Sequence, residues 1–387
     1  MEKRLFKIYG GKMSNFPNDY KISVDPMRKT PFLKHTGVRC DGTTPLYRDV
    51  DGKLWTINGH SNDGRIAMFC GNTIEDMKEL YTIKLNFCDG HADYAFDGIK
   101  YPEGIKARGC IWPFGLYICP KTHRFFAFFH NESGWGGRGT AYDALGPCEK
   151  PHFDSDFRHI GLMHSDNEGK HWTFDRWVLT AEKPCFTEAY NPAGDIAIGQ
   201  KMGKVMLGSG DFSLYVEPDG EYIYIFYDIT TVDTDKGVWD SCDTYVARTR
   251  KRDDGLMGDF VKYYNGSFCE AGNMGKETPI IKDAWHTRVA YAKKYGKYVM
   301  SSSPINAGCG DAVIKDIMEW RVSDDMIHWS EPMKVERNGR PFGNHYMAMV
   351  SEEVGTYPNV IEGDEFVILT NHNGTDVDRQ NARFELV

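Results

Sequence analysis

The sequence predicts an all-β fold, a five-bladed β-propeller of four-stranded antiparallel blades whose ring is closed by N- and C-terminal strands. Three observations predict it: a repeated apolar strand, turn residues that alternate with β-rich segments, and no long amphipathic helical pattern. The repeated strand opens from a turn at five places, which begin at Gly52, Thr122, Gly220, Gly296 and Gly363. Repeats of this period are typical of a toroid of similar sheets.

The strands of each blade can be placed in order along the sequence, and residues 1–387 are expected to form a single propeller domain. The expected segments are 44–50, 53–59, 65–71 and 79–85 for blade one; from Trp112, with 157–164 and 172–180, for blade two; from Asp211, with 244–249 and 260–264, for blade three; His286 to about 335 for blade four; and from near Glu353 for blade five. Segments 383–387 and 4–10 are expected to complete blade five, because pairing both ends removes exposed sheet edges.

Composition narrows the class of partner. The chain of 387 residues is 41% hydrophobic and 13% aromatic, which is ample for a packed core. Its net charge of −9 argues against nucleic acid and anionic membranes as partners, because both need clustered Lys and Arg. No apolar stretch is long enough to span a membrane, and no secretory signal is seen. The ten cysteines show no zinc-ribbon spacing, so we expect a reduced, cytoplasmic protein, with homo-oligomer formation left open.

Loop lengths indicate which face of the propeller carries function. The turns after the first strand of a blade are short, as at Asp51-Gly52, Asp219-Gly220 and Tyr295-Gly296. The loops expected on the opposite face are much longer. Long loops gathered on one face of a scaffold usually carry binding and catalysis. The site is therefore expected where the inner strands begin.

Ionisable residues recur at those strand starts. Shortly before each repeated turn lies a residue expected to begin an inner strand: Asp41, Trp112, Asp211, His286 and Glu353. Asp211 enters an apolar strand directly, and a carboxylate there must be paired or solvated by a pocket. Asp41 precedes a glycine, so a turn residue is its alternative interpretation. The recurrence favours a polar pocket at the centre of the ring.

Two stretches resemble a known group of enzymes. The segment GDFSLYVEPDGEYIYIFY from Gly210 and the turn SDDMIHWSEP from Ser323 are similar to segments of five-bladed propeller glycoside hydrolases. These are the clan of arabinanases and xylosidases, fructosidases and agaro-oligosaccharide hydrolases. The turn SDNEGKHW from Ser165 is similar to the Asp-box turns of sialidases, and such turns are structural.

The resemblance implies roles for individual residues. It implies Asp41 as base or nucleophile and Asp211 as the residue that orients the substrate and tunes the pKa of the acid. The acid is left open between Glu277 and His286, since one related family is similar in using a histidine acid. Hydrolysis of a glycosidic bond needs an acid for the leaving oxygen and a second group that activates water or attacks carbon.

Other residues are expected to bind the oligosaccharide substrate. The predicted contacts are Trp112, Trp285, His60, Asp63 and Glu353, because aromatic faces stack on sugar rings and polar groups bond hydroxyls. Carboxylate catalysis requires no cofactor. A divalent ion, structural or catalytic, is left open.

Two alternatives belong to other classes. His60, Asp63 and His286, with His91 and Asp93 nearby in sequence, would suit zinc or another divalent ion. A metal-dependent amino-sugar deacetylase on a five-bladed propeller is similar in this respect. A sugar-binding propeller without catalysis is the third interpretation. Aligned carboxylates argue against it, so the hydrolase is the main prediction.

Overall fold

The structure is a computed structural model, and the account that follows concerns the residues that it describes. These are 16–28, 33, 42–60, 65–83, 96–97, 110–132, 158–181, 203–233, 235–236, 238–308, 317–353, 355, 357–372 and 376–387.

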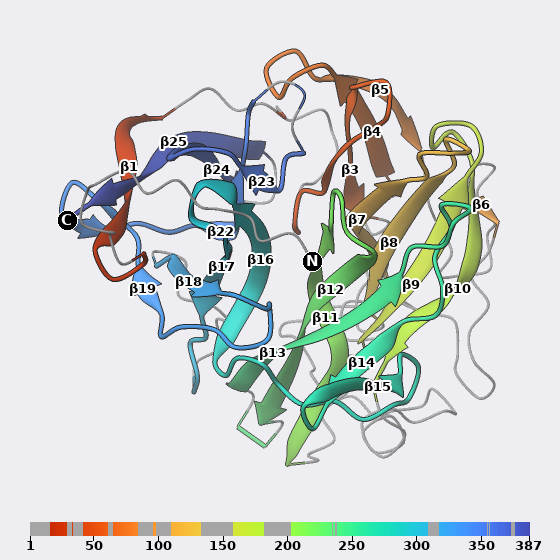
Figure 1. Cartoon of the computed structure of the whole chain (residues 1–387). Coiled ribbons are helices and arrows are strands. Elements are labelled where there is room, and N and C mark those ends of the chain that lie inside the picture. Colours follow the sequence, from red (N-terminus) through yellow and green to blue (C-terminus); the bar gives the residue numbers. More distant parts are fainter. Residues whose placement is uncertain are drawn as a thin grey trace, which may run out of the picture.

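The described strands form four sheets about a common centre (Figure 1), and the ten-stranded sheet comprises two blades joined by the pairing of Gly208 with Arg158, which confirms the predicted β-propeller of five blades. Each is built mainly from strands that follow one another in the chain. Blade one holds β2 (Leu46–Arg48), β3 (Leu54–His60), β4 (Arg65–Gly71) and β5 (Lys78–Ile83). Blade two holds β7 (Cys110–Ile118), β8 (Phe125–Glu132), β9 (Arg158–Ser165) and β10 (Trp172–Thr180), with β6 (Phe96–Asp97) at its edge. Blade three holds β11 (Lys204–Val216), β12 (Tyr222–Asp233), β13 (Val238–Arg250), β14 (Val261–Tyr264) and β15 (Ser267–Ala271).

The last two blades carry small additions. Blade four holds β16 (Ala284–Ala292), β17 (Lys297–Pro304), β18 (Glu319–Ser323) and β19 (Met333–Lys334), with the 3₁₀ turn η3 (Lys293–Tyr295) between β16 and β17; blade five holds β22 (His345–Val350), β24 (Glu365–His372), β25 (Asp376–Leu386) and β1 (Tyr20–Arg28), with β20 (Glu336–Arg337), β21 (Arg340–Pro341) and β23 (Val360–Ile361) beside blades four and five. None of the described residues belongs to a helix long and apolar enough to cross a membrane.

Apolar side chains fill the space between consecutive blades and so hold the ring together. Phe226 of blade three packs in one cluster with Met300 of blade four. Blade four contributes Trp320 to the cluster that it shares with blade five. Leu369 of blade five lies in one cluster with Phe69 of blade one. A further cluster joins blades one, two and three. Because blade five packs on blade one, the ring is closed.

The closing strand comes from the N-terminal part of the chain, as predicted, but from a different segment. β1 pairs with β25 in antiparallel register, with Ile22 opposite Phe384. Figure 1 shows β1 beside the C-terminus. The predicted segment 4–10 lies outside the described residues. The pattern of β1, in which Ile22 and Val24 are buried between half-buried or exposed neighbours, is that of a strand with one face on the core.

Two predicted strand starts are wrong. β11 begins at Lys204, so Asp211 lies in the middle of the inner strand of blade three. Glu353 follows β22 instead of beginning it, and it lies on the connection to β23. The connection between the first two strands of blade five is long, so counting back from the repeated turn at Gly363 falls short of the inner strand. His345 and Tyr346 begin that strand.

The two serine-containing turns are structural, as predicted. The Ser323 hydroxyl accepts hydrogen bonds from the backbone of Asp325 (3.1 Å) and Met326 (2.9 Å). The Ser165 hydroxyl accepts one from the backbone of Gly169 at 2.8 Å. Side-chain oxygens thus satisfy turn amides between the third and fourth strands of blades two and four.

Ring closure can be tested at β1. Ile22→Ala should lower the free energy of unfolding by about 2–5 kcal/mol, because it removes a side chain that is 1% exposed between blades four and five. Lys21→Ala is the matched control on the exposed face of the same strand, with an expected effect within about 0.5 kcal/mol. Urea unfolding measures both. Equal losses of stability in the two variants would contradict the packing of Ile22 between blades four and five.

Candidate active site

Four inner strands change register at the same level of the ring. The shifts fall between Pro113 and Gly115 in β7, Ser209 and Phe212 in β11, Trp285 and Arg288 in β16, and His345 and Ala348 in β22. His286 and Tyr346 lie within two of these bulges and have φ of 54° and 50°. Left-handed backbone at such residues costs on the order of 1–3 kcal/mol and persists where the surroundings impose it. The bulges turn side chains of separate blades toward one point.

The carboxylate of Asp211 lies at that point and is 7% exposed. It accepts hydrogen bonds from the Trp285 indole N–H (3.1 Å) and the Tyr346 hydroxyl (3.3 Å). Nε2 of His286 lies 3.5 Å from Oδ2, and Nη1 of Arg158 lies 3.8 Å from the same oxygen. Donors from blades two, four and five therefore converge on one carboxylate of blade three.

These neighbours keep Asp211 ionised. Burial raises the pKa of this carboxyl, but the hydrogen bond to His286 and the neighbouring His130, His286 and Arg158 outweigh burial. The net effect holds the pKa of Asp211 well below its usual range. An ionised carboxylate in a largely dry site can orient a histidine and stabilise its protonated form.

His286 is fixed on several sides. Its ring stacks on Tyr346 with centroids 4.0 Å apart, and His345 meets it edge-on at 4.8 Å. Its backbone N–H donates to Oδ2 of Asp228 at 2.8 Å. Nε2 faces Asp211, whereas Nδ1 is buried without a hydrogen-bond partner among the described residues. One ring nitrogen thus faces a carboxylate, and the other has no hydrogen-bond partner among the described residues.

Asp228 is a site residue that the sequence reasoning missed. It is fully buried on β12, and it also accepts a hydrogen bond from the Thr244 hydroxyl at 3.4 Å. Burial, and next the charge of Asp211, raise the pKa of Asp228 well above its usual range. The surroundings therefore shift the pKa values of the two carboxyl groups in opposite directions. The available signal was a charged residue inside the apolar run YIYIFYDITTVD.

Aromatic rings surround Asp211 and His286. Trp285 packs on Trp239 (5.1 Å between centroids), and the Arg158 guanidinium lies 5.9 Å from the centre of the Trp239 ring. Trp112 packs on the His130 ring at 5.6 Å. Trp112 and Trp285, both predicted to bind sugar, are 5% and 3% exposed, so their ring faces are largely covered by protein. Trp239 and Tyr346 are only half-buried.

The structure brings Asp211, His286 and Trp285 together but places Glu277 elsewhere. Glu277 lies 2.8 Å from the ammonium of Lys262 and accepts a 2.5 Å hydrogen bond from the Tyr227 hydroxyl. Lys262 is fully buried and also donates to the Thr180 carbonyl at 2.8 Å. No contact among the described residues joins Glu277 to Asp211. Its carboxylate neutralises a buried lysine between blades two and three.

Some of the predicted site residues fall in other parts of the chain. Asp41, Asp63, His91 and Asp93 lie outside the described residues, as does the side chain of His60. The rival metal set of His60, Asp63 and His286 is therefore described only at His286. The chain just after Asp41 is described, and there the Asn371 side chain donates to the Gly42 carbonyl at 2.7 Å.

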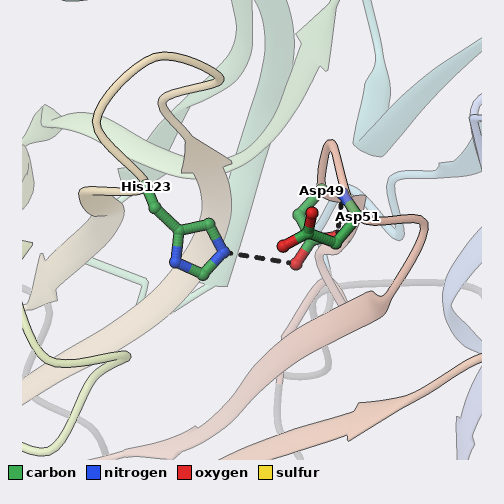
Figure 2. Close-up of side chains that lie close together, drawn as sticks. All are labelled: Asp49, Asp51 and His123. Carbon is green, nitrogen blue, oxygen red and sulfur yellow. Dashed lines mark hydrogen bonds and ion pairs between the residues drawn. The ribbon is translucent and has the colours of Figure 1, made fainter.

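One group of three described residues has potential metal-ligand atoms within 4.8 Å of one another: Asp49, Asp51 and His123 (Figure 2). Asp49 lies in the turn between β2 and β3. Its Oδ1 accepts the amides of Asp51 (3.0 Å) and Lys53 (2.8 Å), and its Oδ2 accepts the Trp55 indole (2.7 Å). These donors already occupy both oxygens, so turn formation accounts for the group.

The sequence matches no protein-family model and no curated protein. Several solved structures are similar in fold. A family 117 glycoside hydrolase from Zobellia galactanivorans is 11% identical, with coverage of 94% of this chain and 90% of that one and a TM-score of 0.48. An α-L-arabinofuranosidase from Lactobacillus brevis is 13% identical, with coverage of 90% and 92% and a TM-score of 0.45. An endo-arabinase from Bacteroides thetaiotaomicron is 12% identical, with coverage of 91% and 96% and a TM-score of 0.41. The structural neighbours of this chain thus include five-bladed propeller glycoside hydrolases at low identity.

The raised pKa of Asp228 predicts a pH-dependent stability. Below pH 3.8, the ordinary pKa of an aspartic acid, the Asp228 carboxyl is protonated in both the folded and the unfolded state, and its contribution to the free energy of unfolding is fully present. This contribution is lost as the pH rises toward the pKa in the folded state, because only the unfolded chain then ionises. Asp228→Asn cannot ionise, so its stability relative to the native chain should rise with pH, by up to about 1.4 kcal/mol per pH unit. Urea unfolding at pH 4 to 7 measures this, with exposed Asp253→Asn as control. Parallel curves for Asp228→Asn and the native chain would refute the raised pKa.

A second prediction concerns Glu277. Glu277→Gln should cost about 3–5 kcal/mol of stability, because it leaves the buried ammonium of Lys262 without a counter-charge. Glu221→Gln breaks an exposed pair with Arg250 and should cost at most about 1 kcal/mol. Denaturant unfolding compares the two. A cost for Glu277→Gln no greater than that for Glu221→Gln would remove the structural role.

Proposed function

We propose that this protein hydrolyses a glycosidic bond of an oligosaccharide, with His286 as the general acid. The observation that carries the proposal is the buried pair of Asp211 and His286, held within a left-handed bulge at the centre of the ring. A strained backbone that presents an oriented imidazole supports a catalytic role over a packing role.

The arrangement supports an acid role at Nδ1. Asp211 faces Nε2 and favours the tautomer that carries a proton there, as the aspartate of a catalytic triad does. Protonated His286 would then donate its Nδ1 proton to the leaving glycosidic oxygen as the bond to the anomeric carbon breaks. Water adds to that carbon and gives up a proton to a base, for which Asp41 remains the candidate.

His286 is a better candidate for the acid than Glu277. The carboxylate of Glu277 is paired with Lys262 and accepts a hydrogen bond from Tyr227. A carboxylate with these partners is less able to donate a proton to a substrate. For sugar contact, the half-buried Trp239 and Tyr346 are better candidates than Trp112 and Trp285, because more of each ring is open to a ligand.

Substitutions test the assignment. His286→Gln and Asp211→Asn should each lower kcat about 10²–10⁴-fold on an oligosaccharide that the native chain cleaves, while circular dichroism and thermal unfolding show a folded protein. Glu277→Gln, assayed well below its unfolding temperature, should keep most of the native kcat. A large loss of kcat in folded Glu277→Gln, with His286→Gln active, would reverse the assignment of the acid.

The products separate hydrolysis of a glycosidic bond from deacetylation. Native protein exhaustively treated with chelator should still release new reducing ends, because proton transfer from His286 needs no Lewis acid. A metal-dependent deacetylase would lose activity with chelator, regain it with a divalent ion and release acetate from an intact chain. Acetate as the sole product would overturn the proposal.

A further inference from the structure

Arg288 carries a buried positive charge that no described carboxylate neutralises. It lies on β16 two residues after His286 and is 7% exposed. Its Nη1 donates to the backbone carbonyl of Thr44, in the segment that leads into blade one. Arg288 takes part in none of the ion pairs found within the described ranges. Two other buried arginines differ, since Arg321 lies 3.0 Å from Glu319 and Arg379 lies 2.7 Å from Glu75.

The charge persists at neutral pH. Burial lowers the pKa of Arg288, but only to about 10, so the guanidinium stays protonated. A backbone carbonyl offers a partial negative charge to one of its five N–H groups. Removing a charge from water without a counter-charge is unfavourable, so such groups are normally paired. A negative partner is therefore to be sought beside Arg288.

Arg288 lines a small cavity among the inner strands, on the side of His286 that leads toward the short turns. Its walls are mainly apolar side chains of blades one, two and three, including Leu46, Leu116 and Val216. Tyr47 and Tyr357 also line it, and phenol hydroxyls can donate to an anion. No carboxylate lies among these residues. The centre of a water-sized sphere can occupy about 20 Å³ of this cavity, which is room for a small occupant.

We propose that this cavity binds one monatomic anion, chloride in solution, held by the guanidinium of Arg288. Size and charge together select this ligand. A water molecule in the cavity would leave the cation without a counter-charge, and a monatomic anion is the smallest ligand that supplies one. The site is distinct from the Asp211–His286 pair and does not depend on the reaction proposed for that pair.

Thermal unfolding in chloride and in gluconate at constant ionic strength tests the proposal. Chloride should raise Tm in a saturable way, by roughly 2 °C at ten times its Kd, because a ligand that binds the folded state alone stabilises it. Gluconate is too large to enter and should not. A native protein whose Tm is the same in both salts throughout the titration would refute the site.

Matched variants assign the effect to one residue. Arg288→Met should abolish the difference in Tm between chloride and gluconate. Arg321→Met removes a buried guanidinium of the same blade that is paired with Glu319, so it should lower Tm but keep the native response to chloride. A native chloride response in Arg288→Met would overturn the assignment.

Crystals grown in bromide give a readout that does not need a folded variant. Anomalous scattering should show one bromide peak within hydrogen-bond distance of the Arg288 guanidinium. Ordered water at that position with no anomalous peak would show that the cavity is merely hydrated, and this would overturn the proposal.

Discussion

A buried negative charge at the centre of the ring is the constraint to which the neighbouring blades conform. The Asp211 carboxylate receives Trp285 and His286 from blade four, Tyr346 from blade five and Arg158 from blade two. Such a charge is tolerated only when several donors surround it, so the positions of these blades are coupled through one side chain. Burial, and next the charge of Asp211, raise the pKa of Asp228, one strand further out, well above its usual range.

The converging side chains require a departure from regular β geometry. In a regular strand, neighbouring side chains alternate between faces, and a straight inner strand would direct few of them toward the axis. Bulges in β7, β11, β16 and β22 break this alternation at one level, and His286 and Tyr346 accept left-handed backbone there. The apolar clusters between blades stabilise the fold and so offset the cost of the strained backbone at the centre of the ring.

Most of the fold could be predicted from the sequence because turn residues and alternating apolar positions report on neighbours close in the chain. The repeated strands correspond to β3, β8, β12, β17 and β24, and Asp211 and His286 were identified from their places before such strands. The strand start predicted at Glu353 is wrong because the first connection of blade five is long. Glu277 could not be placed from spacing, since its segment returns to blade two, where the Gly272 carbonyl accepts a hydrogen bond from the Thr180 amide. The local signal for Asp228 is only a charged residue inside an apolar run, and the place of Tyr346 depends on contacts between blades, which no local pattern encodes.

The pairing of β1 with β25 has a consequence for the order in which the protein is made. A ribosome synthesises β1 before the other described strands and β25 after all of them, yet these two strands are hydrogen-bonded neighbours. Until β25 emerges, Ile22 and Val24 have no sheet to join, and the newly made strand must wait with its apolar side chains exposed. Blades one to four can each collect their strands during synthesis. Blade five cannot, so the nascent chain remains an open arc, and a candidate for chaperone binding, until β25 has been made.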